Sequence, residues 1–142
     1  MNETLSKFGY PESVIFETEH WAVLIRPKQL TLGSAILCTK HEVDSLSEMP
    51  LEALCELKTV SGKLERTLRE SFSNEKINYI ALMMVDKEFH WHVIPRYSKD
   101  VEIYGVDFKD TGWPKYPDLS YKNEISGDIK DKIKETLINN LD

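Results

Sequence analysis

The hydrophobic period of this chain changes twice, and the changes limit the folds open to it. Residues 13–17, 21–26 and 34–39 are short runs rich in β-branched and aromatic residues, which predicts three strands. From residue 51 the apolar positions recur every three or four residues, which predicts a long helix with one apolar face, interrupted by a single polar member (Leu51, Leu54, Leu57, Ser61, Leu64, Leu68, Phe72). Two further strands follow, in 77–85 and around 88–97. The order β-β-β-α-β-β indicates an α+β meander rather than a βαβ alternation.

The chain of 142 residues is expected to form one domain, 1–142, with a less regular C-terminal part after residue 97. The segment GVDFKDTGWPKYPDLS is rich in Gly, Pro and aromatic residues, which is typical of an ordered surface loop. A last helix is predicted over about 126–141, with Ser126 as its N-cap and apolar residues every four positions (Ile129, Ile133, Leu137, Leu141). Gly33 is expected to supply backbone freedom before the third strand.

Composition narrows the functional classes. Hydrophobic residues make up 41% and charged residues 30%, and no apolar run approaches the ~20 residues of a membrane span. The N-terminus has neither a basic start nor an apolar core, so no membrane association and a cytoplasmic location are expected. The net charge of −6 argues against binding to a nucleic acid polymer. Cys38 and Cys55 fit no metal or redox spacing and are most simply buried apolar residues.

The segment EFHWHVIPRY, residues 88–97, carries two of the four histidines. Because side chains alternate faces along a strand, one face should present polar groups and the other should be wholly apolar (Glu88, His90, His92 and Ile94 against Phe89, Trp91 and Val93). The apolar face should pack under the long helix. If Asp86-Lys87 forms a two-residue turn, Met83 lies opposite His90 and Ala81 opposite His92, which would leave a hollow beside the imidazoles.

Three interpretations of this polar face remain open. The two imidazoles could be ordinary surface and partial-core residues. They could bind a metal with Glu88, although His20, His41 and the cysteines offer no spacing that supplies a further ligand. Alternatively, one imidazole could attack phosphorus while its neighbour stabilises the charge.

The third interpretation is favoured by a resemblance. FHWHVIPRY resembles the signature strand of the histidine triad (HIT) superfamily, in which alternating histidines precede Pro-Arg. Upstream, HWAVLIRPKQLTLGSAILCTKHEVDSL is similar to the two leading strands of that family and their turn, and GWPKYPDL resembles a tail of some bacterial members. The resemblance covers about residues 13–97. It implies a five-stranded, mostly antiparallel sheet with the long helix packed on it, a C-terminal helix and a homodimer.

The resemblance also implies a reaction. It assigns His90 as the nucleophile that attacks the α-phosphate of a nucleotide, with His92 as a donor to the phosphate oxygens. Leu24 and Arg26 would line the base and ribose pocket. The expected substrate is a dinucleoside polyphosphate or a nucleoside phosphoramidate, with no metal and no cofactor. The alternative is a nucleotide-binding or interaction protein on the same scaffold that has lost turnover.

This chain departs from the family pattern at several site positions. Glu88 replaces the first histidine of the triad and is expected to belong to the catalytic set with His90 and His92. Ser34 stands where a histidine often follows the turn glycine. Arg26 replaces the usual Asn or Asp. The loop before the triad is short, and Met83 lies in it; Ser34 and Met83 complete the expected substrate-binding set. An ionised Glu88 is expected to raise the pKa of His90 or His92 and to disfavour leaving groups that carry several charges.

Overall fold

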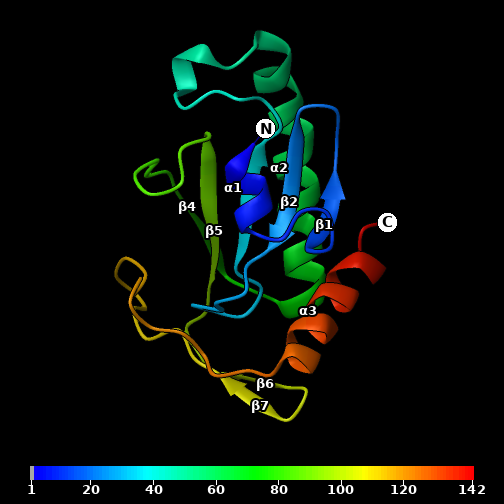
Figure 1. The fold of residues 1–142 in the computed structure, drawn as a ribbon. Helices are drawn as coiled ribbons and strands as arrows, with labels where there is room; N and C mark the ends of the chain where they lie inside the picture. Colours follow the sequence, from blue (N-terminus) through cyan, green and yellow to red (C-terminus); the bar gives the residue numbers. More distant parts are fainter. Residues whose placement is uncertain (1) are drawn as a thin grey trace.

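The fold is centred on one antiparallel sheet of five strands, seen in the computed structural model, which describes residues 2–142 (Figure 1). The strand order is β1-β2-β3-β5-β4, and every neighbouring pair is antiparallel. The strands are β1 (Val14–Glu17), β2 (Trp21–Ile25), β3 (Ala35–Thr39), β4 (Lys76–Ile80) and β5 (His90–Arg96). The predicted α+β, five-stranded architecture is confirmed.

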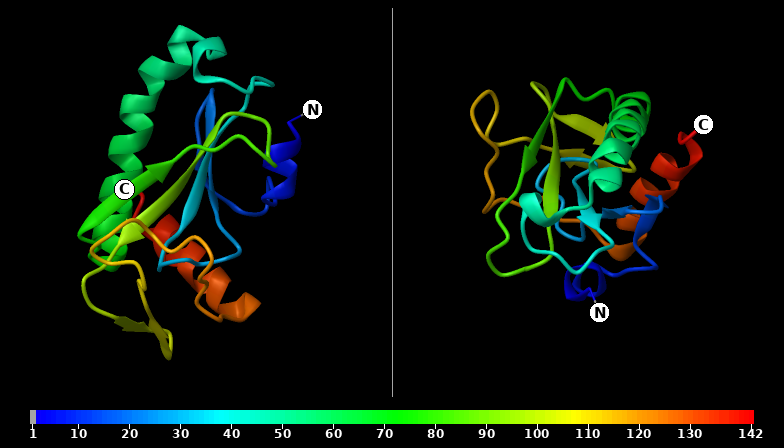
Figure 2. Two further views of the ribbon diagram at one scale, coloured as in Figure 1. Left: turned by 90° about the vertical axis from the view of Figure 1, so that its left-hand side faces the viewer. Right: turned by 90° about the horizontal axis from the view of Figure 1, so that it is seen from above.

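Helices cover both faces of the sheet. The long helix α2 (Leu51–Phe72) lies on one face, and the short N-terminal helix α1 (Glu3–Lys7) lies on the other, as Figure 2 shows with the sheet turned through 90°. All residues of β2 and β3 are buried as a result. Strands buried on both faces lose the alternation of polar and apolar residues, which explains the continuous apolar runs WAVLI and AILCT.

The main core lies between the sheet and α2. Its helix side is formed by six residues of α2, of which Leu64, Leu68 and Phe72 belong to the predicted stripe (the others are Ala53, Val60 and Thr67). Leu51, also in the predicted stripe, is instead 71% exposed, because the buried face at the start of the helix is formed by Ala53 and Val60 and Leu51 lies on the opposite side. On the sheet side Phe89, Trp91 and Val93 join this core, as their alternation predicted.

Gly33 has the conformational role expected of it. Its φ is +87°, a region that L side chains rarely adopt, and an added Cβ would lie 3.0 Å from Leu68 Cδ2. The turn before β3 can therefore pass close under the C-terminal end of α2.

The connection between β4 and β5 differs from the predicted two-residue turn. The strand β4 ends at Ile80, and residues 81–89 form an irregular loop in which Met83 has a φ of +45°. Ile80, rather than Ala81, pairs with His92, so the register is shifted by one residue. A shift of one residue exchanges the two faces of a strand, which invalidates the predicted placement of Ala81 and Met83 beside the imidazoles.

The C-terminal region contains more structure than its composition predicted. Val101–Ile103 (β6) and Val106–Phe108 (β7) form a separate two-stranded sheet. The helix α3 (Gly127–Asn139) begins after Ser126, whose side chain accepts a hydrogen bond from Ile129 N, as predicted. A 3₁₀ turn, η1 (Leu46–Glu48), precedes α2.

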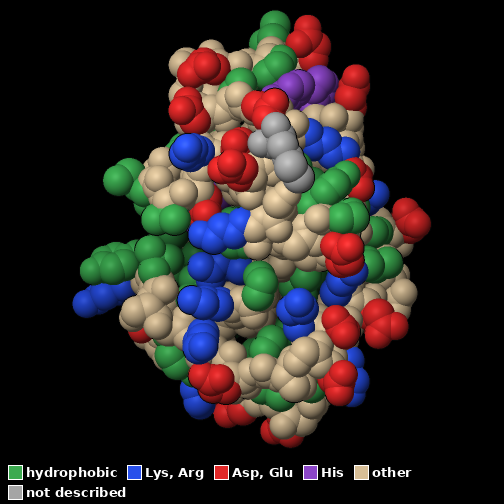
Figure 3. Space-filling model, viewed as in Figure 1, with side chains coloured by type: hydrophobic (Ala, Val, Ile, Leu, Met, Phe, Trp, Pro, Cys, Tyr) green, Lys and Arg blue, Asp and Glu red, His purple; other side chains and the backbone are tan. Residues whose placement is uncertain are grey.

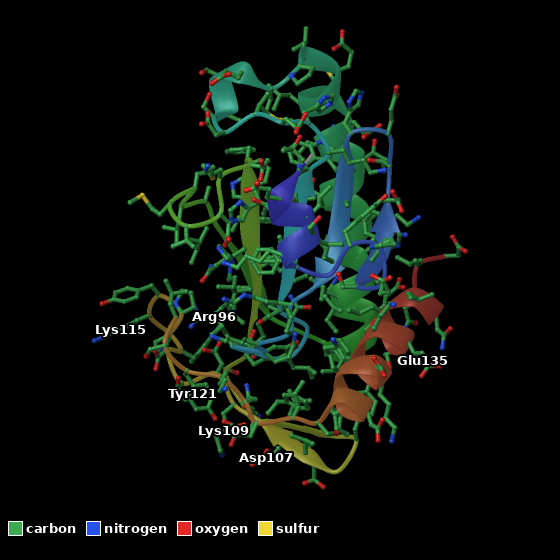
Figure 4. The ribbon with its side chains drawn as sticks, viewed as in Figure 1. Arg96, Asp107, Lys109, Lys115, Tyr121 and Glu135 are labelled. Atoms are coloured by element: carbon green, nitrogen blue, oxygen red, sulfur yellow. The ribbon has the colours of Figure 1, made fainter. Side chains whose placement is uncertain are left out.

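Arg96 joins this region to the sheet. It forms a buried ion pair with Asp110, with 2.7 Å between Arg96 Nε and Asp110 Oδ2. Figure 4 shows Arg96 beside the C-terminal segment that carries Lys115 and Tyr121. The loop after residue 97 is therefore fixed to the end of β5.

The two cysteines differ in their exposure. Cys38 is buried as expected, but Cys55 is exposed on α2, because it faces away from the sheet on the polar side of that helix. Among residues 2–142, no helix has the length and apolar character that crossing a membrane requires.

Candidate functional site

The two histidines of β5 lie on the α1 side of the sheet. The strand β5 pairs with β3, with His90 opposite Cys38 and His92 opposite Ile36. The two imidazole rings form an edge-to-face pair with 5.1 Å between their centroids. The ring of Phe8, at the end of α1, covers both, at 6.3 Å from His90 and 6.4 Å from His92. The two histidines of the predicted polar face are thus neighbours and lie under the N-terminal helix.

The ring of His90 is held in one tautomer. Its Nδ1 lies 2.6 Å from the main-chain oxygen of Glu88. A carbonyl oxygen can only accept a hydrogen bond, so Nδ1 must carry the proton. In the neutral ring Nε2 then keeps its lone pair and can act as a nucleophile or as a metal ligand. The residue is 1% exposed, so its orientation is fixed by packing.

The ring of His92 is neutral at physiological pH. Burial lowers the pKa of His92 to about 4, and its neighbours Arg26 and His90 act in the same direction. This result contradicts the expectation that Glu88 raises the pKa of His92. A neutral imidazole can still donate one hydrogen bond from its remaining N–H.

A cavity of about 260 Å³ opens beside His92. Three cationic side chains line it, together with one carboxylate and two apolar residues (Lys7, Arg26 and Lys28; Asp86; Phe8 and Pro27). The carboxylate of Asp86 is paired with Lys7 at 2.6 Å. In the space-filling view, Lys and Arg side chains form a column down the middle of this face (Figure 3). The cavity is therefore locally basic although the whole chain carries a charge of −6.

Arg26 differs from the other cations of this cavity. Its Nη1 donates to the main-chain oxygen of Lys28 at 3.1 Å, but its buried Nε has no hydrogen-bond partner among the described residues. Burial lowers the pKa of Arg26, with a small opposing effect of Asp86. A half-buried guanidinium with an unsatisfied donor is costly. The part of the guanidinium that lines the cavity could bind an anion there.

Glu88 is turned away from this cavity. Its Oε1 accepts hydrogen bonds from Thr4 N at 2.9 Å and from Thr4 Oγ1 at 2.6 Å, and its own N–H donates to Thr4 Oγ1. Burial raises the pKa of Glu88, but the hydrogen bonds from Thr4 outweigh it and hold that pKa below its ordinary value. The carboxylate at the first triad position therefore fastens α1 to the sheet.

The remaining sequence-predicted residues occupy different surroundings. Leu24 is fully buried on the α1 side, in a cluster with Leu5 and Ile36. Ser34 is also buried, and its hydroxyl donates to the main-chain oxygen of Thr31 within the turn. Met83 packs against the α2 core and does not line the cavity, because of the register shift described above. Arg26 and His92 are thus the two predicted residues that share the cavity.

Sequence reasoning missed the contribution of the N-terminal segment. Lys7 and Phe8 line the cavity, but α1 has only five residues, too few for a hydrophobic period to be detected. One local signal was present. Asn2 precedes the helix as an N-cap residue and its side chain accepts from Leu5 N.

Comparison with known proteins gives a consistent result. A family model described as the HIT domain matches residues 7–99. A search of curated proteins finds no significant match. Similar solved structures include a histidine triad protein from Sinorhizobium meliloti 1021, with 18% identity and a TM-score of 0.75 over 99% of this chain and 95% of that chain. A histidine triad protein from Marinobacter aquaeolei VT8 has 22% identity and a TM-score of 0.74 over 99% of this chain and 94% of that chain. A hypothetical histidine triad nucleotide-binding protein from Sulfolobus tokodaii strain7 aligns at 14% identity and a TM-score of 0.69, covering 91% of this chain and 83% of that chain. At these identities the structural likeness supports the fold.

Proposed function

The chain belongs to the HIT domain family, and on that premise we propose that it is a nucleotide hydrolase or nucleotidyl transferase that works through a nucleotidyl-histidine. The observation that carries the proposal is the contact between His90 Nδ1 and the Glu88 main-chain oxygen, because it leaves the lone pair of Nε2 available. The proposed substrate is a dinucleoside polyphosphate or a nucleoside phosphoramidate.

The proposed reaction has two displacements at the α-phosphorus. In the first, His90 Nε2 forms a bond to phosphorus, the P–O or P–N bond to the leaving group breaks, and the leaving group departs with the electron pair. In the second, water attacks the same phosphorus, the P–N bond to His90 breaks, and a nucleoside monophosphate is released. The N–H of His92 would donate to a phosphate oxygen in both steps, as a neutral donor at pH 7.

The charge of the cavity supports an anionic substrate. Arg26 and Lys28 line it in addition to the paired Lys7 and Asp86, and Arg26 has an unsatisfied donor. The repulsion expected from Glu88 toward multiply charged leaving groups is weakened, because that carboxylate does not line the cavity and accepts hydrogen bonds from Thr4. We therefore propose that polyphosphate leaving groups are accepted.

Assembly and location are further parts of the proposal. We propose a cytoplasmic homodimer that pairs through α2 and the edge of β4. The strand β4 is at the edge of its sheet, so a second strand could pair with its outer side. Next to it, Leu57, Tyr79 and Trp91 line a partly apolar hollow between α2 and the sheet. Sedimentation equilibrium at micromolar concentration tests this part, and a monomer would contradict it.

Rapid-quench trapping with a substrate labelled in its α-phosphate tests the reaction. The expected result is an acid-labile label on His90, and its loss in His90→Ala, with folding unchanged by circular dichroism. His92→Asn is the matched control, because it should slow the reaction while the label still maps to His90. If the wild type binds nucleotide without ever forming a labelled intermediate, the protein is a nucleotide-binding member of the family without turnover.

A further inference from the structure

Two other histidines meet at the end of the sheet where β2 begins and β3 ends. His20 precedes β2 and His41 follows β3, and the pairing of Trp21 with Thr39 brings them together across the hairpin. Their rings are stacked at 5.1 Å, with 2.8 Å between His20 Nδ1 and His41 Nε2. Figure 3 shows histidine side chains on the surface near this end of the molecule. Neither residue lines the cavity beside His92.

Two carboxylates complete this cluster. Glu19 lies beside the ring, with 3.7 Å between its Oε2 and His20 Nε2. Glu56 reaches the same place from α2, and its Oε1 accepts hydrogen bonds from His20 N at 2.9 Å and from Thr18 Oγ1. Ligand atoms of Glu19, His20 and Glu56 all lie within 4.8 Å of one another.

We propose that His20, Glu19 and Glu56 form a binding site for a divalent transition-metal ion of the zinc type, with His41 as the partner that orients His20. Two ligands of a tetrahedral zinc ion are separated by about 3.4 Å, since each bond is about 2.1 Å long. In this structure the three ligand atoms lie within 4.8 Å of one another, so the side chains of Glu19 and Glu56 would both have to rotate toward His20 to hold an ion.

The contact with His41 is compatible with the tautomer of His20 that metal binding needs. When His20 Nδ1–H donates to His41 Nε2, the lone pair of His20 is on Nε2, the nitrogen that faces Glu19. A second group that holds the far nitrogen of a ligand histidine is the usual arrangement at metal sites.

The donor set decides the class of metal. One imidazole nitrogen with two carboxylate oxygens suits zinc and its first-row neighbours, whereas Mg²⁺ and Ca²⁺ prefer oxygen ligands alone.

A bound ion would connect parts of the fold that are distant in sequence. Glu19 and His20 belong to the turn between β1 and β2, whereas Glu56 belongs to the long helix α2. Binding to the folded state alone raises its apparent stability, so a metal at about one hundred times its dissociation constant should raise Tm by several degrees.

The test is calorimetric titration of Zn²⁺ into tag-free protein that has been stripped with EDTA. The expected result is one ion per chain, with binding at least ~10-fold weaker in Glu56→Gln and in Glu19→Gln. In Glu56→Gln the new amide oxygen can still accept from His20 N and Thr18, so the turn should be preserved. Glu19 is 82% exposed, so its replacement should not disturb folding.

Two control variants make the result decisive. Glu52→Gln changes an exposed carboxylate one helical turn earlier on α2 and should leave binding unchanged. His92→Asn removes an imidazole of the other pair and should also leave it unchanged. Equal Zn²⁺ affinity in Glu56→Gln and Glu52→Gln would overturn the proposal. So would loss of the single binding event in His92→Asn, which would assign the ion to β5.

Discussion

The hydrogen bonds between Glu88 and Thr4 should fasten α1 over the histidines, and a double-mutant cycle can measure this. The two residues lie 84 positions apart in the sequence, and three hydrogen bonds join them. The variants are Glu88→Ala, Thr4→Val and the double variant. Val keeps the shape of Thr and its main-chain N–H, but its side chain cannot donate to the carboxylate.

The magnitude follows from the contacts. A hydrogen bond to a charged group contributes about 1.5–3 kcal/mol, and the low end applies here because Glu88 is only half-buried. Thr4→Val removes the 2.6 Å bond from Thr4 Oγ1 to the Glu88 carboxylate, which is the bond that the cycle isolates, because the bond from Glu88 N to Thr4 Oγ1 is also present in Glu88→Ala. We therefore expect a coupling free energy of about 2 kcal/mol between the two side chains.

Two assays report on this coupling. Urea unfolding of the four proteins gives the coupling in global stability. Hydrogen exchange of the Thr4 amide, which donates to Glu88, gives the local opening of α1, and the exchange should be about 30-fold faster in Glu88→Ala if opening becomes ~2 kcal/mol easier. Lys7→Ala is the matched control, because it removes the exposed ion pair with Asp86 and should cost less than about 1 kcal/mol.

The sign of the pH dependence provides an independent check. The pKa of Glu88 is lower in the folded protein than its ordinary value of 4.5. Its contribution is therefore complete above that value and is lost as the pH falls through the folded-state pKa. A coupling below about 0.5 kcal/mol at pH 7, or an exchange rate for Thr4 that Glu88→Ala leaves unchanged, would refute the role given to this contact.

Three further predictions concern the cavity and its support. The pKa of His92 is about 4 in the folded protein, against an ordinary value of 6.5, so the folded protein should lose up to about 3 kcal/mol of stability as the pH falls from 6.5 to 4. Urea unfolding should show that this loss is absent in His92→Asn. Arg26→Ala should weaken binding of a nucleoside triphosphate about 10-fold or more by calorimetry, whereas Lys122→Ala, a change outside the cavity lining, should not. Gly33→Ala should lower the free energy of unfolding by about 1–3 kcal/mol, since φ is +87° and the new Cβ meets Leu68; unchanged stability would contradict this.

The parts of the fold that depend on period could be predicted from the sequence. The stripe of α2 and the alternation of Phe89, Trp91 and Val93 each repeat often enough to indicate a structure. The register between β4 and β5 could not be predicted in the same way, because it depends on the conformation of the loop 81–89, where Met83 adopts a positive φ. Short elements were missed because they are too brief to show a period, since α1, β6 and β7 have five, three and three residues.

The candidate site was predictable only in part, because a strand pattern assigns faces but not partners. His90 and His92 were expected to share a face, and they do. The direction of the Glu88 carboxylate depends on its contact with Thr4. The two residues lie 84 positions apart in the sequence, so no local pattern could indicate this contact. The meeting of His20 and His41 likewise depends on the register of β2 and β3.

The direction of the Glu88 side chain determines how the replacement of the first triad histidine affects the charge around the cavity. A carboxylate directed into the cavity would oppose the cations there and raise the pKa of the imidazoles. Because the carboxylate is instead bonded to Thr4, the pKa of His92 is set mainly by burial and then by Arg26, and both keep that ring neutral. A neutral His92 donates one hydrogen bond and holds no charge, so the positive potential for a polyphosphate must come from Arg26 and Lys28 instead. In this chain, His92 therefore supplies a hydrogen bond, while Arg26 and Lys28 supply the positive charge. This division follows from the use of Glu88, the residue at the first triad position, to hold the N-terminal helix on the sheet.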